Sequence, residues 1–209
     1  MAKLLYIESS PRKERSASIA VARHFLAAYR DAQSLDTIET LDLWHALLPR
    51  FDAAAMDAKY AIMHGQSHTA AQRKAWQGIE KIAAQFKAAD KYVLAVPMWN
   101  FSIPYVLKHY LDLLVQPGLT FSFSPAEGYK GLITGKPIAL IVARGGAYGA
   151  GTGAESYDYQ ISYLKHILGF IGFTNPQTIV IEPTLGAPEA REQALAAAKQ
   201  KADELARMF

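Results

Sequence analysis

The stretch VLAVPMWNFSIPYVLKH, residues 93–109, begins as an apolar strand and ends in an unusual way. After the apolar run come a methionine, a tryptophan, an asparagine and a phenylalanine, and Pro104 then opens a segment with helical periodicity. Proline suits the first turn of a helix, because an N–H group at that position would have no acceptor within the helix. The stretch therefore predicts a buried strand that passes through a broad, partly aromatic turn into a helix.

The same alternation of strand and helix extends over the rest of the chain. Hydrophobic patterning predicts buried or half-buried strands at 4–8, 36–43, 92–96, 137–143 and 178–182. Helical periodicity predicts helices at 18–32, 52–66, 69–89, 104–115, 158–170 and 188–208. Strands that alternate with helices indicate an α/β fold, in which helices cover both faces of a parallel sheet. Five such strands suit the flavodoxin-like strand order 2-1-3-4-5.

Composition limits the classes of function. The 209 residues are 51% hydrophobic and 20% charged, which fits one domain over residues 1–209. The net charge is +3 and the cationic residues are scattered among acids, so no nucleic-acid partner is expected. Without cysteine the chain has no disulfides, thiolate metal sites or cysteine nucleophiles. Neither a signal peptide nor a membrane-spanning stretch is found, so we expect a cytoplasmic protein with no membrane partner.

Open parallel sheets bind ligands outside the carboxyl ends of their strands, and three loops there have unusual compositions. The first, SSPRKERSAS at 9–18, holds four serines and three cationic residues. Serine hydroxyls and the free N–H groups at a helix start can bind a phosphate. Alternatively, the loop is solvated and ends in a serine N-cap. It has neither a Walker sequence nor GxGxxG, so a monophosphate suits it better than a pyrophosphate.

The second loop is the aromatic turn of the opening stretch. Met98, Trp99 and Phe101 either close the top of the core or form a surface for a planar ligand. Asn100 favours the ligand slightly, because a carboxamide between two aromatic residues is poor core material.

The third loop, 144–153, contains five glycines. Residues 149–154 match GxGxxA, but they follow the fourth strand and no suitably placed acid follows, so the match to a dinucleotide motif is weak. Close approach of the backbone to a flat ligand explains the glycines better. Arg144 either supplies positive charge beside that ligand or is solvated.

Two histidines, His64 and His68, lie four residues apart, as in some helical metal sites. A glycine separates them and no zinc-protease glutamate follows the first one. We therefore interpret both as exposed helix or loop residues and expect no metal site.

Taken together, the three loops resemble those of the FMN-dependent NADH azoreductases, which also act as NAD(P)H:quinone oxidoreductases. The resemblance covers nearly the whole chain and includes the segments SSPRKERSAS, PMWNFSIPYVLKHYLDLLVQPGLTFSF, GLITGKP, ARGG and LGFIGF. It implies a flavodoxin-like fold, a tightly bound FMN, NADH or NADPH as electron donor, and a quinone or azo compound as acceptor. It also implies a homodimer with each site built across the subunit interface.

The resemblance assigns roles to individual residues. It implies that the FMN phosphate lies on Ser10, Ser16, Ala17 and Ser18. It implies that the isoalloxazine ring lies on Met98, Trp99, Asn100 and Phe101, and that its pyrimidine side faces Ala143, Arg144, Gly145 and Gly146. On the substrate side it implies aromatic residues of the second subunit, namely Phe123, Tyr129 and Phe170.

This chain departs from the family at several of these positions. Alanine stands at 17 where a polar residue is common and at 143 where serine is common, and Trp99 stands where tyrosine is common. Side-chain hydrogen bonds are lost at these positions, whereas backbone contacts are kept. Tyr148 stands where the family often has histidine, which leaves it only a candidate proton donor that we expect to be dispensable.

The implied chemistry is a two-electron hydride transfer in which donor and acceptor use one pocket in turn, so ping-pong kinetics are expected. The N–H groups of Gly145 and Gly146 are suited to stabilise negative charge on the reduced ring. Two alternatives remain: a flavodoxin-like electron carrier, or a sensor that binds NAD(P) without flavin. Carriers of that kind are usually acidic, whereas this chain is basic.

Overall fold

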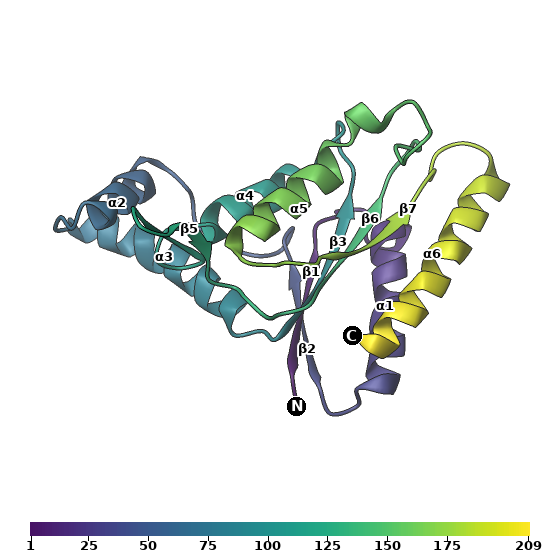
Figure 1. Cartoon of the computed structure of the whole chain (residues 1–209), viewed down its shortest axis with the longest axis horizontal. Helices are drawn as coiled ribbons and strands as arrows, with labels where there is room; N and C mark the ends of the chain where they lie inside the picture. Colours follow the sequence, from purple (N-terminus) through teal and green to yellow (C-terminus); the bar gives the residue numbers. More distant parts are fainter.

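A five-stranded parallel sheet forms the centre of the protein (Figure 1). The computed structural model describes residues 1–209. In spatial order the strands are β2 (Thr37–Asp42), β1 (Lys3–Glu8), β3 (Lys91–Pro97), β6 (Ile138–Ala143) and β7 (Gln177–Ile181). The inner strands β1, β3 and β6 are almost wholly buried, as their apolar runs predict, whereas the edge strand β2 is partly exposed.

The predicted strand order needs a correction. Two short strands, β4 (Phe121–Ser124) and β5 (Gly128–Gly131), pair into an antiparallel hairpin outside the main sheet. The sequence-based order 2-1-3-4-5 did not count them, and the order in the structure is β2-β1-β3-β6-β7. Alternation of apolar residues is too short over four-residue strands to be recognised as a separate sheet. The predicted five-stranded parallel sheet with helices on both faces is confirmed.

Helices cover the sheet on both faces (Figure 1). One face is covered by α1 (Ala17–Ala32) and α6 (Pro188–Met208), and the other by α3 (Ala70–Lys87), α4 (Tyr105–Leu114) and α5 (Tyr159–Ile171). The remaining helix, α2 (Ala53–Met63), packs on α3. Side chains alternate along β1, so Leu4 and Tyr6 join the core beneath α1 and α6, whereas Leu5 and Ile7 join the other core.

The helices begin where the sequence offers suitable capping residues. The side chain of Ser16 accepts the N–H of Ile19 at the start of α1. Thr69 and Gln72 form a reciprocal capping box at the start of α3, and Asp158 caps α5. Each cap stabilises its helix by about 1 kcal/mol. None of the helices combines the length and apolar character that a membrane span requires.

The parallel arrangement determines where a ligand can bind. The loops after β1, β3, β6 and β7 leave the sheet at the same edge, because the carboxyl ends of parallel strands coincide. The strand register aligns the carboxyl ends of these strands, because Pro97 pairs with Ala143 and Glu8 pairs with both Asp42 and Ala95. The three loops singled out in the sequence therefore meet.

Candidate functional site

A cavity of about 230 Å³ lies where these loops converge. Its lining combines predicted residues from all three loops, namely Ser10, Ser16, Ala17, Met98, Trp99, Ala143 and Gly145. The other lining residues were not predicted and are Arg12, Arg15, Pro97, Thr184, Leu185 and Arg191. The structure thus brings together residues from all three loops whose compositions are unusual. Ser18, Asn100, Phe101, Arg144 and Gly146 lie beside this cavity in the chain without lining it.

The hydroxyl side of the cavity is formed by the start of α1. Ser10 and Ser16 are buried, and Ser18 is fully buried behind them. The Oγ atom of Ser16 accepts the N–H of Ile19 at 3.4 Å and lies 3.1 Å from Oγ of Ser18. The N–H groups of Ala17 and Ser18 have no acceptor in the protein, and Ala17 lines the cavity, so the positive end of the α1 dipole lies beside it.

Three arginines line the cavity. Arg12 and Arg15 come from the loop after β1, and Arg191 comes from the first turn of α6. None of the three takes part in an ion pair, and no carboxylate lines the cavity. Three unpaired arginines beside a helix N-terminus form a site for a dianion. Arg191 could not be found from the sequence, because an arginine near a helix start has no distinctive signal.

The second loop is a strained two-residue turn. Trp99 and Ser102 exchange two backbone hydrogen bonds of 3.0 and 2.9 Å across it. Asn100 and Phe101 have positive φ angles of 46° and 69°. Positive φ is tolerated by asparagine but is a genuine outlier for a bulky residue such as Phe101, whose side chain is 44% exposed. A strained, exposed aromatic residue at a strand end indicates a ligand surface more strongly than a plug for the core.

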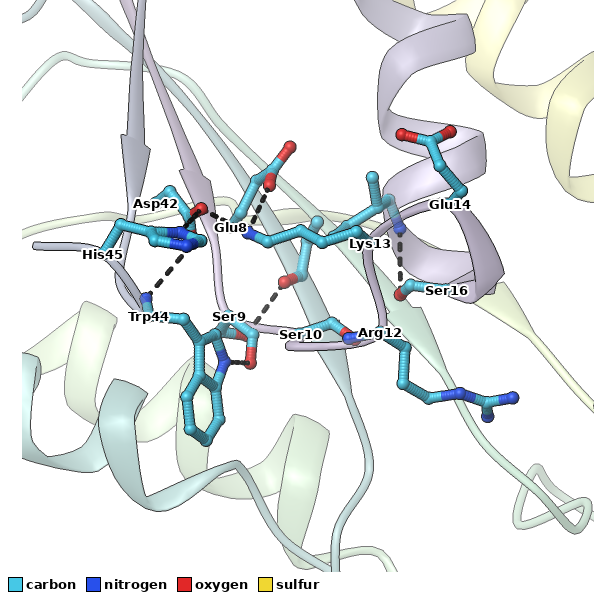
Figure 2. Close-up of polar contacts among 12 residues, drawn as sticks. Glu8, Ser9, Ser10, Arg12, Lys13, Glu14, Ser16, Asp42, Trp44 and His45 are labelled. Atoms are coloured by element: carbon cyan, nitrogen blue, oxygen red, sulfur yellow. Dashed lines mark hydrogen bonds and ion pairs between the residues drawn. The ribbon is translucent and has the colours of Figure 1, made fainter.

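Trp99 forms a wall between two cavities. It lines the 230 Å³ cavity and also a neighbouring one of about 890 Å³, whose lining includes Asn100, Ser102 and Tyr105. The Trp99 ring lies 5.8 Å from that of Trp44 and 6.4 Å from that of Tyr105. Trp44 is fixed in turn, because its Nε1–H donates to the carbonyl of Ser9 at 3.0 Å (Figure 2). A tryptophan at position 99 is thus part of a packed aromatic group.

The third loop lies against the segment after β7. The N–H groups of Thr184 and Leu185 both donate to the carbonyl of Gly145, at 3.1 and 3.0 Å. A Cβ atom at Gly145 would lie only 2.8 Å from Cδ1 of Leu185, so a larger residue there would require the Leu185 side chain to move. The N–H groups of Gly145 and Gly146 have no acceptor within the protein. They are therefore available to acceptor atoms on the rim of a flat ligand.

The side chain of Arg144 does not belong to the cavity. It is 2% exposed, and it donates to Gln160 at 3.2 Å, to Glu182 at 3.1 Å and to Asp158 at 2.5 Å. The alternative in which this side chain is solvated is therefore wrong, and its role in supplying positive charge beside a ligand stays a prediction. Two carboxylates distant in the sequence, Asp158 and Glu182, hold the guanidinium group, and the side chain is not among the residues that line the cavity.

Tyr148 lies beside the aromatic turn. Its ring meets that of Phe101 edge to face at 6.2 Å, and its N–H donates to Glu182 at 2.9 Å. A Cβ atom on Gly146 would lie 3.3 Å from the Tyr148 hydroxyl, so this hydroxyl reaches the third loop. The position is compatible with a proton donor to a ligand on the turn, and this role stays a prediction.

The three residues predicted for the substrate side gather elsewhere. Phe123 and Tyr129 pair across the β4–β5 hairpin with ring centroids 4.8 Å apart, and the Phe170 ring lies 5.5 Å from that of Tyr129. Phe123 and Tyr129 are 60% and 66% exposed. Phe170 lies eleven residues after Tyr159 on α5, roughly 16 Å along the helix from the loop edge. The three rings do not line either cavity of their own chain.

The two histidines considered as metal ligands do not form such a site. His64 follows the last turn of α2 and stacks on Tyr60, whereas His68 lies in the segment before α3. No group of three or more His, Cys, Asp or Glu side chains is arranged to hold a metal ion.

The site joins two kinds of surface. One end is cationic and rich in hydroxyl and N–H donors, and the other is flat, aromatic and bordered by free backbone N–H groups. This combination fits a ligand that carries a phosphate at one end and a planar heteroaromatic ring at the other.

Comparison with known proteins identifies the family. Residues 2–206 match a family described as having a flavodoxin-like fold. Over 207 residues the chain is 51% identical to an FMN-dependent NADH:quinone oxidoreductase of Desulfotalea psychrophila, with 99% of this chain and 97% of that protein covered. The chain belongs to the FMN-dependent NADH:quinone oxidoreductases. A protein of the same name from Nitratidesulfovibrio vulgaris (strain DP4) is 49% identical over 210 residues, with both chains fully covered.

Solved structures agree with this family. An azoreductase from Bacillus anthracis str. Sterne superposes with a TM-score of 0.92 at 36% identity, over 100% of both chains. An FMN-dependent NADH-azoreductase from Bacillus anthracis str. Ames Ancestor, solved in complex with FMN, has a TM-score of 0.85 at 31% identity. That alignment covers 99% of this chain and 100% of the other. The predicted resemblance and the predicted enzyme class, an FMN-dependent oxidoreductase, are confirmed.

Proposed function

We propose that the 230 Å³ cavity holds the phosphate end of FMN in an enzyme that transfers hydride from NADH or NADPH to quinones and azo compounds. The observation that carries this proposal is the convergence of three unpaired arginines and the start of α1 opposite the Met98–Phe101 turn. The phosphate would be held by Ser10, Ser16, Ala17 and Ser18, as the resemblance implies, and also by Arg12, Arg15 and Arg191. The chemistry of this donor set matches a dianion.

The isoalloxazine ring would lie on the aromatic turn. Met98 and Trp99 line the cavity, and Asn100 and Phe101 follow them in the strained turn. Bound FMN supplies the hydride chemistry, and the protein supplies position and electrostatics. Backbone N–H groups of Gly145 and Gly146 would stabilise negative charge at the pyrimidine side, because they have no other acceptor. Ala143 and Arg144 would contribute their backbone only.

We place both substrates on the open side of this platform. The 890 Å³ cavity adjoins it at Trp99 and Asn100, and Tyr105 offers a further aromatic surface. A nicotinamide ring and a quinone are both flat, so each can stack on the same surface. If they use it in turn, the kinetics are ping-pong.

We further propose that residues 1–209 form one domain and that the enzyme is a cytoplasmic homodimer. Phe101, Tyr105, Tyr157 and Tyr159 are exposed around the platform, and a second exposed aromatic group, Phe123 with Tyr129, lies away from it. A two-fold dimer can place the second group of one subunit over the platform of the other, together with Phe170. Exposed aromatic surfaces of this kind are characteristic of interfaces. The cytoplasm is where the expected nicotinamide donor is available.

Anaerobic stopped-flow spectroscopy tests this function. The FMN-loaded protein is mixed first with NADH and then with a benzoquinone, while the flavin absorbance near 450 nm is recorded. We expect complete bleaching in the first mixing and complete recovery in the second. Bleaching by NADH without recovery would overturn the quinone as acceptor. Failure of NADH to bleach the flavin, with rapid one-electron reduction by a protein partner, would instead support the electron carrier.

A further inference from the structure

We propose that Lys13 is a positioning residue that fixes the phosphate-binding loop to the ends of β1 and β2. Through this loop it would set the preference of the protein for FMN over riboflavin, which has no phosphate. The proposal rests on the flavin site proposed above. Lys13 does not line the cavity, so it would act through its neighbours Arg12 and Arg15.

Lys13 connects the loop to two strands at once (Figure 2). Its Nζ atom lies 3.1 Å from Oε2 of Glu8 and also contacts Oδ2 of Asp42. Glu8 ends β1, Asp42 ends β2, and the two are register partners in the sheet. A single ammonium group therefore bridges both carboxylates and ties the loop to the ends of two paired strands.

The surroundings of both carboxylates favour an ion pair with Lys13. The side chain of Glu8 is only 8% exposed, so its charge needs a partner. Asp42 is held in place by the N–H of Trp44, which donates to its Oδ1 at 3.1 Å, and by Nδ1 of His45, 2.5 Å from its Oδ2. Asp42 is thus fixed independently of Lys13, whereas Lys13 is the one cation that pairs with Glu8.

The backbone of Lys13 is in an unfavourable conformation. Its φ angle is 45°, in the left-handed region that residues with a Cβ atom rarely adopt. Such conformations persist where surrounding contacts determine them. Here the conformation allows a tight turn, in which the carbonyl of Lys13 accepts the N–H of Ser16 at 2.9 Å. Ser16 caps α1, so the side-chain ion pairs of Lys13 and the start of that helix are coupled.

The turn sends its side chains in two directions. In Figure 2 the lysine side chain points toward Glu8 and Asp42, whereas the Arg12 side chain leaves on the other side of the loop. Arg12 and Arg15 line the phosphate cavity, and a backbone hydrogen bond of 3.0 Å from Arg15 to Arg12 spans the turn. Release of Lys13 would free this turn and spread the two guanidinium groups.

The test compares binding of FMN and riboflavin to the apoprotein by quenching of flavin fluorescence. In Lys13→Met we expect the Kd for FMN to rise about tenfold, the effect of losing one hydrogen bond to a charged group. We expect the Kd for riboflavin to change by less than about twofold, because the turn serves the phosphate and not the ring. Lys13→Arg keeps both ion pairs in reach and should restore most of the preference for FMN.

Glu14→Gln is the matched control. Glu14 lies in the same turn, but it is exposed and pairs with Arg23 on α1 instead of the sheet. Its substitution should leave both Kd values unchanged. If Lys13→Met loses helical circular dichroism, the double variant Glu8→Gln/Lys13→Met removes the unpaired buried carboxylate and permits the same measurement.

The outcomes separate this proposal from the proposed function. A wild-type protein that binds riboflavin as tightly as FMN would overturn the phosphate site itself. A wild-type protein that prefers FMN, together with a Lys13→Met variant of unchanged preference, would overturn only the role of Lys13. Equal weakening of both ligands would show a general structural effect and would also overturn it.

Discussion

Arg144 and Glu182 form a partly buried ion pair at the glycine loop 144–153, with Nη1 of the arginine 3.1 Å from Oε2 of the glutamate. The arginine follows β6 and the glutamate follows β7, so the pair joins the ends of two neighbouring strands. The same glutamate oxygen accepts the N–H of Tyr148 at 2.9 Å. The conformation of the glycine loop is therefore supported by a charged pair whose side chains do not line the cavity.

This arrangement predicts that Arg144→Lys destabilises the fold. Lysine has no planar fork of donors, so it cannot serve Glu182, Asp158 and Gln160 together. We expect the free energy of unfolding to fall by about 2 kcal/mol, less than for complete loss of a buried charge. Urea denaturation measures this, with Arg207→Lys at the exposed end of α6 as control. An unchanged unfolding curve with lost FMN binding would mean that the guanidinium contacts the flavin.

The position of Arg191 leads us to expect that α6 contributes to flavin binding. It is exposed, unpaired and in the first turn of the helix, where it lines the 230 Å³ cavity. Arg191→Met should raise the Kd for FMN about tenfold, because one charge-assisted contact is lost. The salt dependence of FMN binding should become weaker as well. Titrations at several ionic strengths check this, and Arg207→Met at the other end of α6 should behave like the wild type.

We expect the Trp99 side chain to restrict the size of the quinone that the enzyme accepts. The indole separates the two cavities and packs against Trp44 and Tyr105. Trp99→Tyr replaces this wall by a smaller ring, so the KM of a bulky naphthoquinone should fall while that of benzoquinone changes little. We expect a difference of about tenfold, as for one or two methylene groups in a pocket. Steady-state kinetics with both quinones measure it, and equal changes in both would contradict a steric role.

We expect removal of the Tyr148 hydroxyl to have only a small effect on turnover. Its hydroxyl lies near Gly146, but water can reach an open platform and can supply protons instead. Tyr148→Phe should keep kcat within about threefold of wild type, since loss of a general acid would cost about a hundredfold or more. The comparison uses anaerobic single-turnover rates for reoxidation by quinone. A hundredfold loss would assign the proton to this residue.

The sequence predicted the fold well because its signals are local. Each main strand is a short apolar run and each helix has a clear repeat, so the boundaries at Pro104 and Pro188 agree with α4 and α6 to one residue. The two hairpin strands were left out of the predicted strand order because strands of four residues have too little periodicity.

The site was predicted where it depends on strand ends and missed where it depends on distant contacts. Ser10, Met98 and Gly145 meet because parallel strands end at one edge. The side chain of Arg144 does not line the cavity because it pairs with the acids at 158 and 182, and no local sequence pattern reveals such a pairing. Leu185 enters the cavity wall for a similar reason, since its approach to Gly145 is tertiary.

We expect Asp36 to make an acid-sensitive contribution to stability. It directly precedes β2 and so lies at the amino-terminal end of the strands, whereas the site lies at their carboxyl ends. Its carboxylate accepts the N–H of Ala2 at 2.5 Å and the hydroxyl of Tyr29 at 2.6 Å, and Lys91 lies 3.4 Å away. These contacts, the backbone N–H of Ala2 first, lower the pKa of Asp36 from 3.8 to about 2. Because the folded-state pKa is the lower one, the charged form stabilises the fold above the ordinary pKa.

This stabilisation is lost as the pH falls from about 4 through about 2, because the carboxylate is protonated over that range. Asp36→Asn should therefore be less stable than the wild type at neutral pH, and the difference should shrink over the same range. Urea denaturation followed by circular dichroism at a series of pH values measures both curves. Asp31→Asn, an exposed carboxylate on α1, is the control and should follow the wild type throughout. A difference that persists undiminished at the acid end would show that the asparagine disturbs packing and that the charge of Asp36 contributes little.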